Sequence, residues 1–197
     1  MSKPQSDLIE SCFHNEVNRR DFFDRVVKFG VAGAIAALLP SAVLERVLAA
    51  APPPKQDNWR QCHKCATMFY NGFRTKGRCP KSGAHIIDSD SNYKLTYNSP
   101  GPGQREWRFC NKCDALFFNG YAKKGVCAAG GGHFAQGFNF TLRYDNQAVG
   151  RHDWRYCNKC QAMFYDGEYN NKGVCAAGGF HVAAGYKFVL DDTVGFD

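Results

Sequence analysis

What this 197-residue sequence lacks narrows the kinds of protein it can encode. Between residues 55 and 197 no apolar period of about 3.6 residues is sustained, which argues against a helical bundle. The main apolar run, residues 26–39, is interrupted by Lys28 and is too short to cross a bilayer comfortably. Only 3 tryptophans occur, and each of them opens a copy of the same motif.

That motif is W-R-x-C-x-K-C-x2-[ML]-F-[FY], and it begins at Trp59, Trp107 and Trp154. Each copy continues with a glycine, a K-G-x-C-x5-H segment and an aromatic-x-Leu strand. Regular self-similarity over tens of residues is typical of repeat architectures. We expect short strands and turns within each copy. The repeats occupy residues 59–97, 107–144 and 154–192.

Each repeat is small for a domain that must fold by burial alone. Chains of about 40 residues usually need a disulfide, a metal ion or a neighbour. We therefore predict small β-rich, metal-stabilised modules, arranged as three tandem zinc-ribbon-like repeats. A threefold β-trefoil-like closure is the alternative, because three units of similar length suit that architecture.

The number of cysteines favours metal over disulfides. Each repeat has 3 cysteines, so no repeat can pair all of its own thiols. With the recurring histidine, each repeat offers a Cys3His set, which is what tetrahedral zinc requires. We predict three zinc ions; a C-x2-C disulfide scaffold and an iron or iron–sulfur centre are the alternatives. The predicted ligands are Cys62, Cys65, Cys79 and His85; Cys110, Cys113, Cys127 and His133; and Cys157, Cys160, Cys175 and His181.

No acid or base recurs in register with these ligands. Four protein ligands close each predicted site, whereas a catalytic zinc keeps one position for water. Asp166 and Glu168 belong to one repeat only. The sequence therefore favours structural metal ions and a protein that is not an enzyme, and we assign no catalytic residue.

Other residues recur beside the predicted metal ligands. An arginine follows each tryptophan, and a lysine precedes the glycine of each K-G-x-C segment. An aromatic residue follows each glycine turn. One interpretation is electrostatic support for anionic thiolates. The other is a row of three pockets for an acidic or polyhydroxylated ligand. The candidate ligand-binding residues are Arg60, Arg108, Arg155, Lys76, Lys124, Lys172, Phe73, Tyr121 and Tyr169.

The first fifty residues resemble an export signal of the bacterial twin-arginine (Tat) type. Arg19 and Arg20 precede two phenylalanines and the apolar run, and small residues near Ala50 suit a signal peptidase. We assign residues 1–50 to the signal and 51–58 to a proline-rich linker. The expected location is periplasmic or extracellular, with no membrane span after cleavage. A retained anchor and an amphipathic helix of the mature protein are the alternatives.

The repeat also resembles a tandem W-R-x-C-x-K-C-x2-L-F repeat of exported, uncharacterised bacterial proteins, over residues 59–190. That resemblance implies export and modularity, and no particular reaction. The opening of the repeat is similar to some RNA-binding zinc fingers as well. Those end in a second C-x2-C, which this chain lacks.

The charge gives a mild indication of the partner. The formal net charge is +7, and residues 1–49 contain as many acidic as basic side chains, so the excess belongs to the repeats. We therefore hypothesise that three weak sites bind a cell-wall, cell-surface or extracellular glycan, or another acidic polymer, by avidity. The alternatives are a structural or assembly subunit of an envelope or extracellular complex, and a nucleic-acid-binding zinc-finger array. Export makes a nucleic acid the least expected partner.

Overall fold

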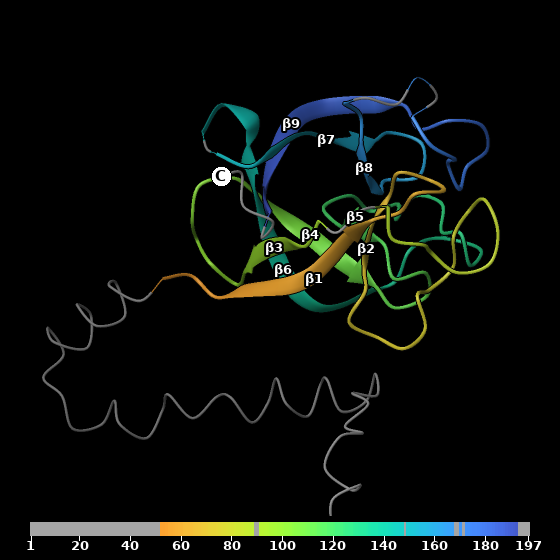
Figure 1. The fold of residues 1–197 in the computed structure, drawn as a ribbon, viewed down its shortest axis with the longest axis horizontal. Coiled ribbons are helices and arrows are strands. Elements are labelled where there is room, and N and C mark those ends of the chain that lie inside the picture. Colours follow the sequence, from red (N-terminus) through yellow and green to blue (C-terminus); the bar gives the residue numbers. More distant parts are fainter. Residues whose placement is uncertain (1–51, 89–90, 148, 168–169, 171, 193–197) are drawn as a thin grey trace, which may run out of the picture. The chain divides into compact units, whose positions relative to one another are not determined.

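The structure, a computed structural model, describes residues 52–192 apart from 89–90, 148, 168–169 and 171 (Figure 1). The expected signal, residues 1–50, lies outside the described residues, and so does the candidate ligand-binding residue Tyr169. Within the described part of the chain, no helix has the length and apolarity needed to cross a membrane.

Each repeat contributes one long strand, one three-residue strand and one returning strand. The long strands are β1 (Lys55–Gln61), β4 (Gln104–Cys110) and β7 (Arg151–Cys157). The short strands are β2 (Met68–Tyr70), β5 (Leu116–Phe118) and β8 (Met163–Tyr165). The returning strands are β3 (Tyr93–Tyr97), β6 (Ala135–Tyr144) and β9 (Ala183–Asp192). A 3-10 turn, η3 (Asp145–Gln147), follows β6.

A bulge in each long strand turns its tryptophan inward. The residues before the three tryptophans, Asn58, Glu106 and Asp153, have positive φ values of 64°, 69° and 63°. The register with the returning strand shifts at the same places. A bulge bends a strand and re-aims its side chains. As a result all three tryptophans are fully buried.

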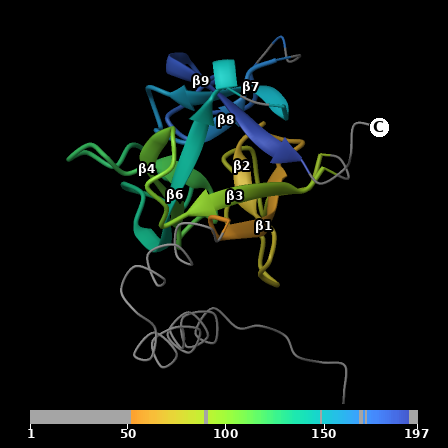
Figure 2. The same ribbon diagram turned by 90° about the vertical axis from the view of Figure 1, so that its left-hand side faces the viewer.

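Strands of different repeats pair with one another. Within each repeat the long strand pairs antiparallel with both the short and the returning strand. Between repeats, β3 pairs with β6, β6 with β9, and β9 with β3. Single bridges join the short strands in the same cyclic way. The result is a β-rich, nearly closed sheet (Figures 1 and 2).

The core is shared between the repeats. Trp59 packs against Phe140 of repeat two, with ring centroids 5.1 Å apart. Trp107 packs in the same way against Phe188 of repeat three, at 5.3 Å. Trp154 completes the cycle against Tyr93 of repeat one, at 5.1 Å. Each tryptophan therefore fills a boundary between two repeats and does not cap a core of its own.

The predicted β-rich class is confirmed, whereas the tandem zinc-ribbon-like arrangement is not. All described residues lie in one compact unit, Pro40–Asp197. The cyclic pairing agrees with the threefold closure that was the alternative. The physical reason is that a forty-residue repeat buries its aromatic face only against the next repeat.

Candidate metal centres

A tight turn after each long strand brings two cysteine thiols together. In repeat one the Ala66 amide donates to the Cys62 carbonyl at 2.8 Å, and the Cys62 amide donates to the Thr67 carbonyl at 2.9 Å. Ala66 then has a φ of 58°, which reverses the chain. The bond equivalent to the first one measures 2.9 Å in repeat two and 2.8 Å in repeat three. This turn accounts for the C-x2-C spacing of every copy.

A second loop supplies the third cysteine and the histidine. The Cys79 amide donates to the Gly83 carbonyl at 2.8 Å, which closes a short turn inside C-x5-H. Lys64, from the C-x-K-C turn, donates to the Ser82 carbonyl in this loop. The equivalent lysines of repeats two and three also donate to the loop carbonyls. The recurring lysine therefore fastens the loop of the third ligand to the turn of the first two.

In each repeat the four predicted ligands converge. Their ligand atoms lie within 4.8 Å of one another, and all twelve residues are buried. From repeat one to three, the Sγ atoms of the first and third cysteines are 4.0, 3.9 and 3.8 Å apart. The distance from the second cysteine Sγ to the histidine Nδ1 is 3.6, 3.5 and 3.5 Å. The three groups, which could hold metal ions, are site one (Cys62, Cys65, Cys79, His85), site two (Cys110, Cys113, Cys127, His133) and site three (Cys157, Cys160, Cys175, His181).

These separations fit tetrahedral coordination of an ion with the bond lengths of zinc. Bonds of about 2.3 Å to sulfur and about 2.0–2.1 Å to nitrogen place two sulfurs about 3.8 Å apart, and a sulfur and a nitrogen about 3.5 Å apart. A disulfide would bring two sulfurs to about 2.05 Å. The nine cysteines of the described residues are all free. The geometry therefore favours metal over the alternative disulfide scaffold.

Each histidine ring is held on two sides. The His85 ring stacks on Phe69, with centroids 4.8 Å apart and planes 15° apart. The rings in repeats two and three stack on the equivalent phenylalanines, with centroids 4.6 Å apart. The Nε2 atom of His85 donates to the Cys113 carbonyl of repeat two at 3.1 Å. Such a bond fixes the tautomer that leaves Nδ1 available for a metal ion.

Within each Cys3His group, the thiols and the imidazole shift one another's pKa. In site one, burial and the neighbouring Cys62 and Cys79 thiols raise the pKa of Cys65 well above its usual value. Hydrogen bonds with Cys62 and Cys65 lower the pKa of Cys79. Burial lowers the pKa of His85, but hydrogen bonds to Cys62 and Cys79 outweigh it and raise the pKa to about 9. Without metal, thiolates thus lie beside an imidazolium, whose positive charge a divalent cation replaces.

The candidate ligand-binding lysines and arginines donate to backbone carbonyls. Lys76 donates to the carbonyls of Asn71 and Phe73, both at 2.7 Å, and Lys124 and Lys172 bond to the same region of their own repeats. Arg60 donates to the Ser91 carbonyl at 2.6 Å, and the equivalent arginines reach Gly137 and Gly185 at 3.0 and 3.3 Å. These contacts favour structural roles for all six side chains.

The aromatic candidates differ from one another. Phe73 is buried against Tyr70 and Phe109, with ring centroids 5.0 and 5.6 Å apart. Tyr121, at the equivalent place in repeat two, is 53% exposed. Phe73 therefore belongs to the core, and Tyr121 is the described aromatic candidate that a ligand can reach.

Sequence reasoning missed the contact between each Lys-Gly pair and the next repeat. A Cβ added to Gly77 would lie 2.2 Å from the Cys113 carbonyl oxygen of site two. The equivalent distances are 2.1 Å for Gly125 and 2.2 Å for Gly173, which faces site one. The three glycines have φ values of 59°, 61° and 67°. The only signal in the sequence was the recurrence of Lys-Gly in every copy.

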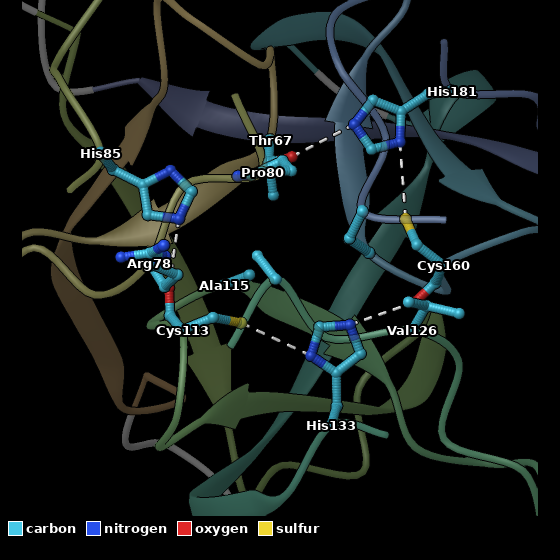
Figure 3. A pocket seen from close by; sticks show the side chains of 13 residues that line it. Thr67, Arg78, Pro80, His85, Cys113, Ala115, Val126, His133, Cys160 and His181 are labelled. Atoms are coloured by element: carbon cyan, nitrogen blue, oxygen red, sulfur yellow. Dashed lines mark hydrogen bonds between the residues drawn. The ribbon is translucent and has the colours of Figure 1, made fainter. Parts of the chain in front are cut away.

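The three histidines surround a small hollow between the sites (Figure 3). Alanine, valine and proline side chains line it together with the three histidines, Cys113, Cys160, Thr67 and Arg78. Repeat one contributes Thr67 and Arg78, where repeat two has Ala115 and Val126. The side chains of the repeats therefore differ in polarity where the three Cys3His groups face one another.

No protein-family model, curated protein or solved structure matches this chain. Its function is therefore inferred from the three buried Cys3His groups and the β framework around them.

Proposed function

We propose that the protein is an exported, non-catalytic zinc protein in which three zinc ions are structural. The observation that carries this proposal is that four buried protein ligands converge in each site, with ligand atoms within 4.8 Å of one another, and four ligands are what a closed structural zinc site requires. Structural zinc contributes about 10–16 kcal/mol in comparable small sites. That is more than a repeat of this size gains from its own core.

Chelation tests the structural role. Complete removal of zinc from the full chain should unfold the sheet, because each ion joins the turn after a long strand to a distant loop. The circular dichroism of the β-structure should be lost, and the emission of the three fully buried tryptophans should shift to the red. Added zinc should restore both signals. A chain that keeps its fold without metal would contradict the proposal.

We further propose that this framework binds an extracellular, cell-wall or cell-surface glycan, or another acidic polymer. The charge supports an acidic partner: +7 from the sequence, and about +4 once three Cys3His zinc ions are counted at −1 each. The exposed ring of Tyr121 supports a sugar, because an aromatic face can pack against the apolar face of a sugar ring.

Three equivalent basic pockets receive no support, because their lysines and arginines bond to the backbone. A deletion of one repeat is not a test of avidity, because it would remove strands that the other repeats pair with. Binding to cell-wall fractions and acidic polysaccharides, lost in Tyr121→Ala and kept in Tyr121→Phe, would support the glycan. An absence of binding to all of them would contradict it.

A structural or assembly subunit is the second candidate, favoured by exposed apolar side chains beside the metal loops. Ile86, Phe134 and Val182, which directly follow the three histidines, are 54%, 61% and 45% exposed. An exposed apolar side chain at the same place in every repeat would give a partner protein three equivalent contacts. A partner that copurifies with the wild type and not with Phe134→Asp would support this role. A nucleic-acid role would instead give single-strand binding that weakens steeply with salt.

The export proposal rests on the twin arginines of the first fifty residues. Replacing both Arg19 and Arg20 with lysine should leave the protein in the cytoplasm. Continued export of this double variant would contradict the twin-arginine route.

A further inference from the structure

The three metal centres are linked by hydrogen bonds that lead from each histidine to the next repeat. His85 of site one donates to the carbonyl of Cys113, which is itself a ligand of site two. His133 of site two donates to the carbonyl of Cys160, a ligand of site three. Both distances are 3.1 Å. At each of these two junctions, one backbone carbonyl group therefore links the histidine of one site to a cysteine of the next.

The third junction, from site three back to site one, is built differently (Figure 3). The Nε2 atom of His181 lies 3.3 Å from the Thr67 hydroxyl, which lies 3.5 Å from the Cys65 carbonyl oxygen. The Nδ1 atom of His181 faces the Cys160 thiol at 3.5 Å, so the Nε2 hydrogen is the one that points to Thr67. The hydroxyl accepts from His181 and donates to Cys65, and so relays the contact.

No hydroxyl is available at the other two junctions. The residues equivalent to Thr67 are Ala115 and Ala162. The backbone contact is nevertheless the same at all three, since Gly173 approaches the Cys65 carbonyl as closely as Gly77 approaches that of Cys113. The difference is therefore confined to the histidine, and Thr67 supplies the partner that His181 would otherwise lack.

We propose that these bonds couple the three sites, and that Thr67 is the positioning residue that carries the coupling between sites three and one. This inference rests on the proposed metal binding. An ion fixes the C-x2-C turn and its carbonyl, and that carbonyl in turn orients the histidine of the preceding site. Because coupling between binding sites is reciprocal, an ion at either site raises the affinity of the other.

The size of the effect follows from burial. Thr67 and His181 are each 3% exposed, so water does not readily replace a lost hydroxyl. Partners that orient a metal-bound histidine typically change metal affinity by about 10–100-fold. A Thr67 variant should therefore weaken one site by about that factor and leave the direct bonds of the other two unchanged.

Three variants of the full zinc-loaded chain separate positioning from general stability. Thr67→Val keeps the shape and removes the hydroxyl, whereas Thr67→Ser keeps the hydroxyl. Thr141→Val is the matched control: Thr141 is 5% exposed, and its hydroxyl donates to the Ser99 carbonyl at 3.2 Å, away from the metal ligands. Zinc release to a chromophoric chelator gives the rates, and thiol alkylation read by mass spectrometry identifies the site that opens first.

In Thr67→Val, one ion of three should leave about 10–100 times faster than in the wild type. Alkylation should then reach Cys157, Cys160 and Cys175 first. Thr67→Ser and Thr141→Val should release zinc like the wild type. Three ions that leave Thr67→Val at the wild-type rate, or three that accelerate equally, would overturn the role of Thr67.

Partial loading tests the coupling itself. With less than one zinc per site, the native mass spectrum of the wild type should show mainly metal-free and fully loaded chains. Thr67→Val should accumulate chains with two ions. A statistical distribution in the wild type would overturn the coupling, while a wild-type chain that holds no zinc would instead refute the proposed function.

Discussion

The substitution Gly77→Ala probes the junction between sites one and two. Gly77 has a φ of 59°, and an added Cβ would lie 2.2 Å from the Cys113 carbonyl oxygen, where real contacts essentially never fall below 3.0 Å. The same oxygen accepts hydrogen bonds from His85 Nε2 at 3.1 Å and from the Arg78 amide at 3.3 Å. A methyl group must therefore push the two repeats apart, and both hydrogen bonds are lost.

The expected destabilisation is the sum of these effects. A non-glycine residue in the left-handed region costs about 1–2 kcal/mol. Each lost hydrogen bond costs about 1 kcal/mol. Gly77→Ala should thus lower the free energy of unfolding by about 3–4 kcal/mol. Gly83→Ala is the control, because Gly83 has a φ of 55° and an added Cβ meets nothing within 4 Å. It should cost only about 1–2 kcal/mol.

Urea denaturation of the full zinc-loaded chain, followed by tryptophan emission, measures both values. The two variants should have similar slopes and clearly different midpoints. Equal losses of stability in Gly77→Ala and Gly83→Ala would refute the close approach of Gly77 to the Cys113 carbonyl of the next repeat.

Three further results are expected. Trp107→Ala should lower the free energy of unfolding by about 3–5 kcal/mol, because this fully buried side chain spans the boundary to repeat three. Urea denaturation measures this loss. A loss as small as that of Tyr121→Ala, at an exposed side chain, would count against a shared core. Cys113→Ser should release the ion of site two and also weaken site one, which a metal count per chain would reveal; loss of one ion with no change at site one would mean that the sites are independent. In a chain that the ions of sites two and three keep folded, zinc binding at site one should release about two protons near pH 7, because in the folded state the pKa of Cys65 is raised and that of His85 is about 9. Affinity should therefore rise with pH, and less steeply above pH 9, where His85 is already neutral; calorimetry in buffers of different ionisation enthalpy would show the protons, and heats that do not depend on the buffer would contradict this.

The three Cys3His groups were predictable because the information that specifies them is local. C-x2-C forms one turn and C-x5-H another, and three copies in register distinguished ligands from other residues. The recurrence also excludes His63 as a ligand, because the other repeats have asparagine at its position. In the structure its Nδ1 lies 2.7 Å from Asp88.

The arrangement of the repeats was less predictable because it depends on contacts distant in sequence. The alternation of apolar and polar residues in β3 indicates that one of its faces is buried but does not say what covers that face. Trp59 finds its partner, Phe140, in another repeat. A pattern within one repeat cannot specify such a pair.

The recurring basic residues and aromatics were the hardest to interpret. Lysine and arginine reach backbone carbonyls whose positions only the fold determines. Phe73 and Tyr121 occupy equivalent positions, yet only Phe73 is buried, against Phe109. Repeat two places Tyr121 beside Tyr156, with ring centroids 6.2 Å apart. Exposure here depends on a neighbour from the next repeat.

The metal content is tested most directly by a native mass spectrum of the protein purified from its own compartment without chelator. The proposed function predicts a chain that begins near Ala50 and carries three zinc ions, all of which are lost under denaturing conditions. A metal-free chain, lighter by about two mass units for each pair of oxidised cysteines, would contradict the Cys3His zinc centres and indicate a disulfide scaffold.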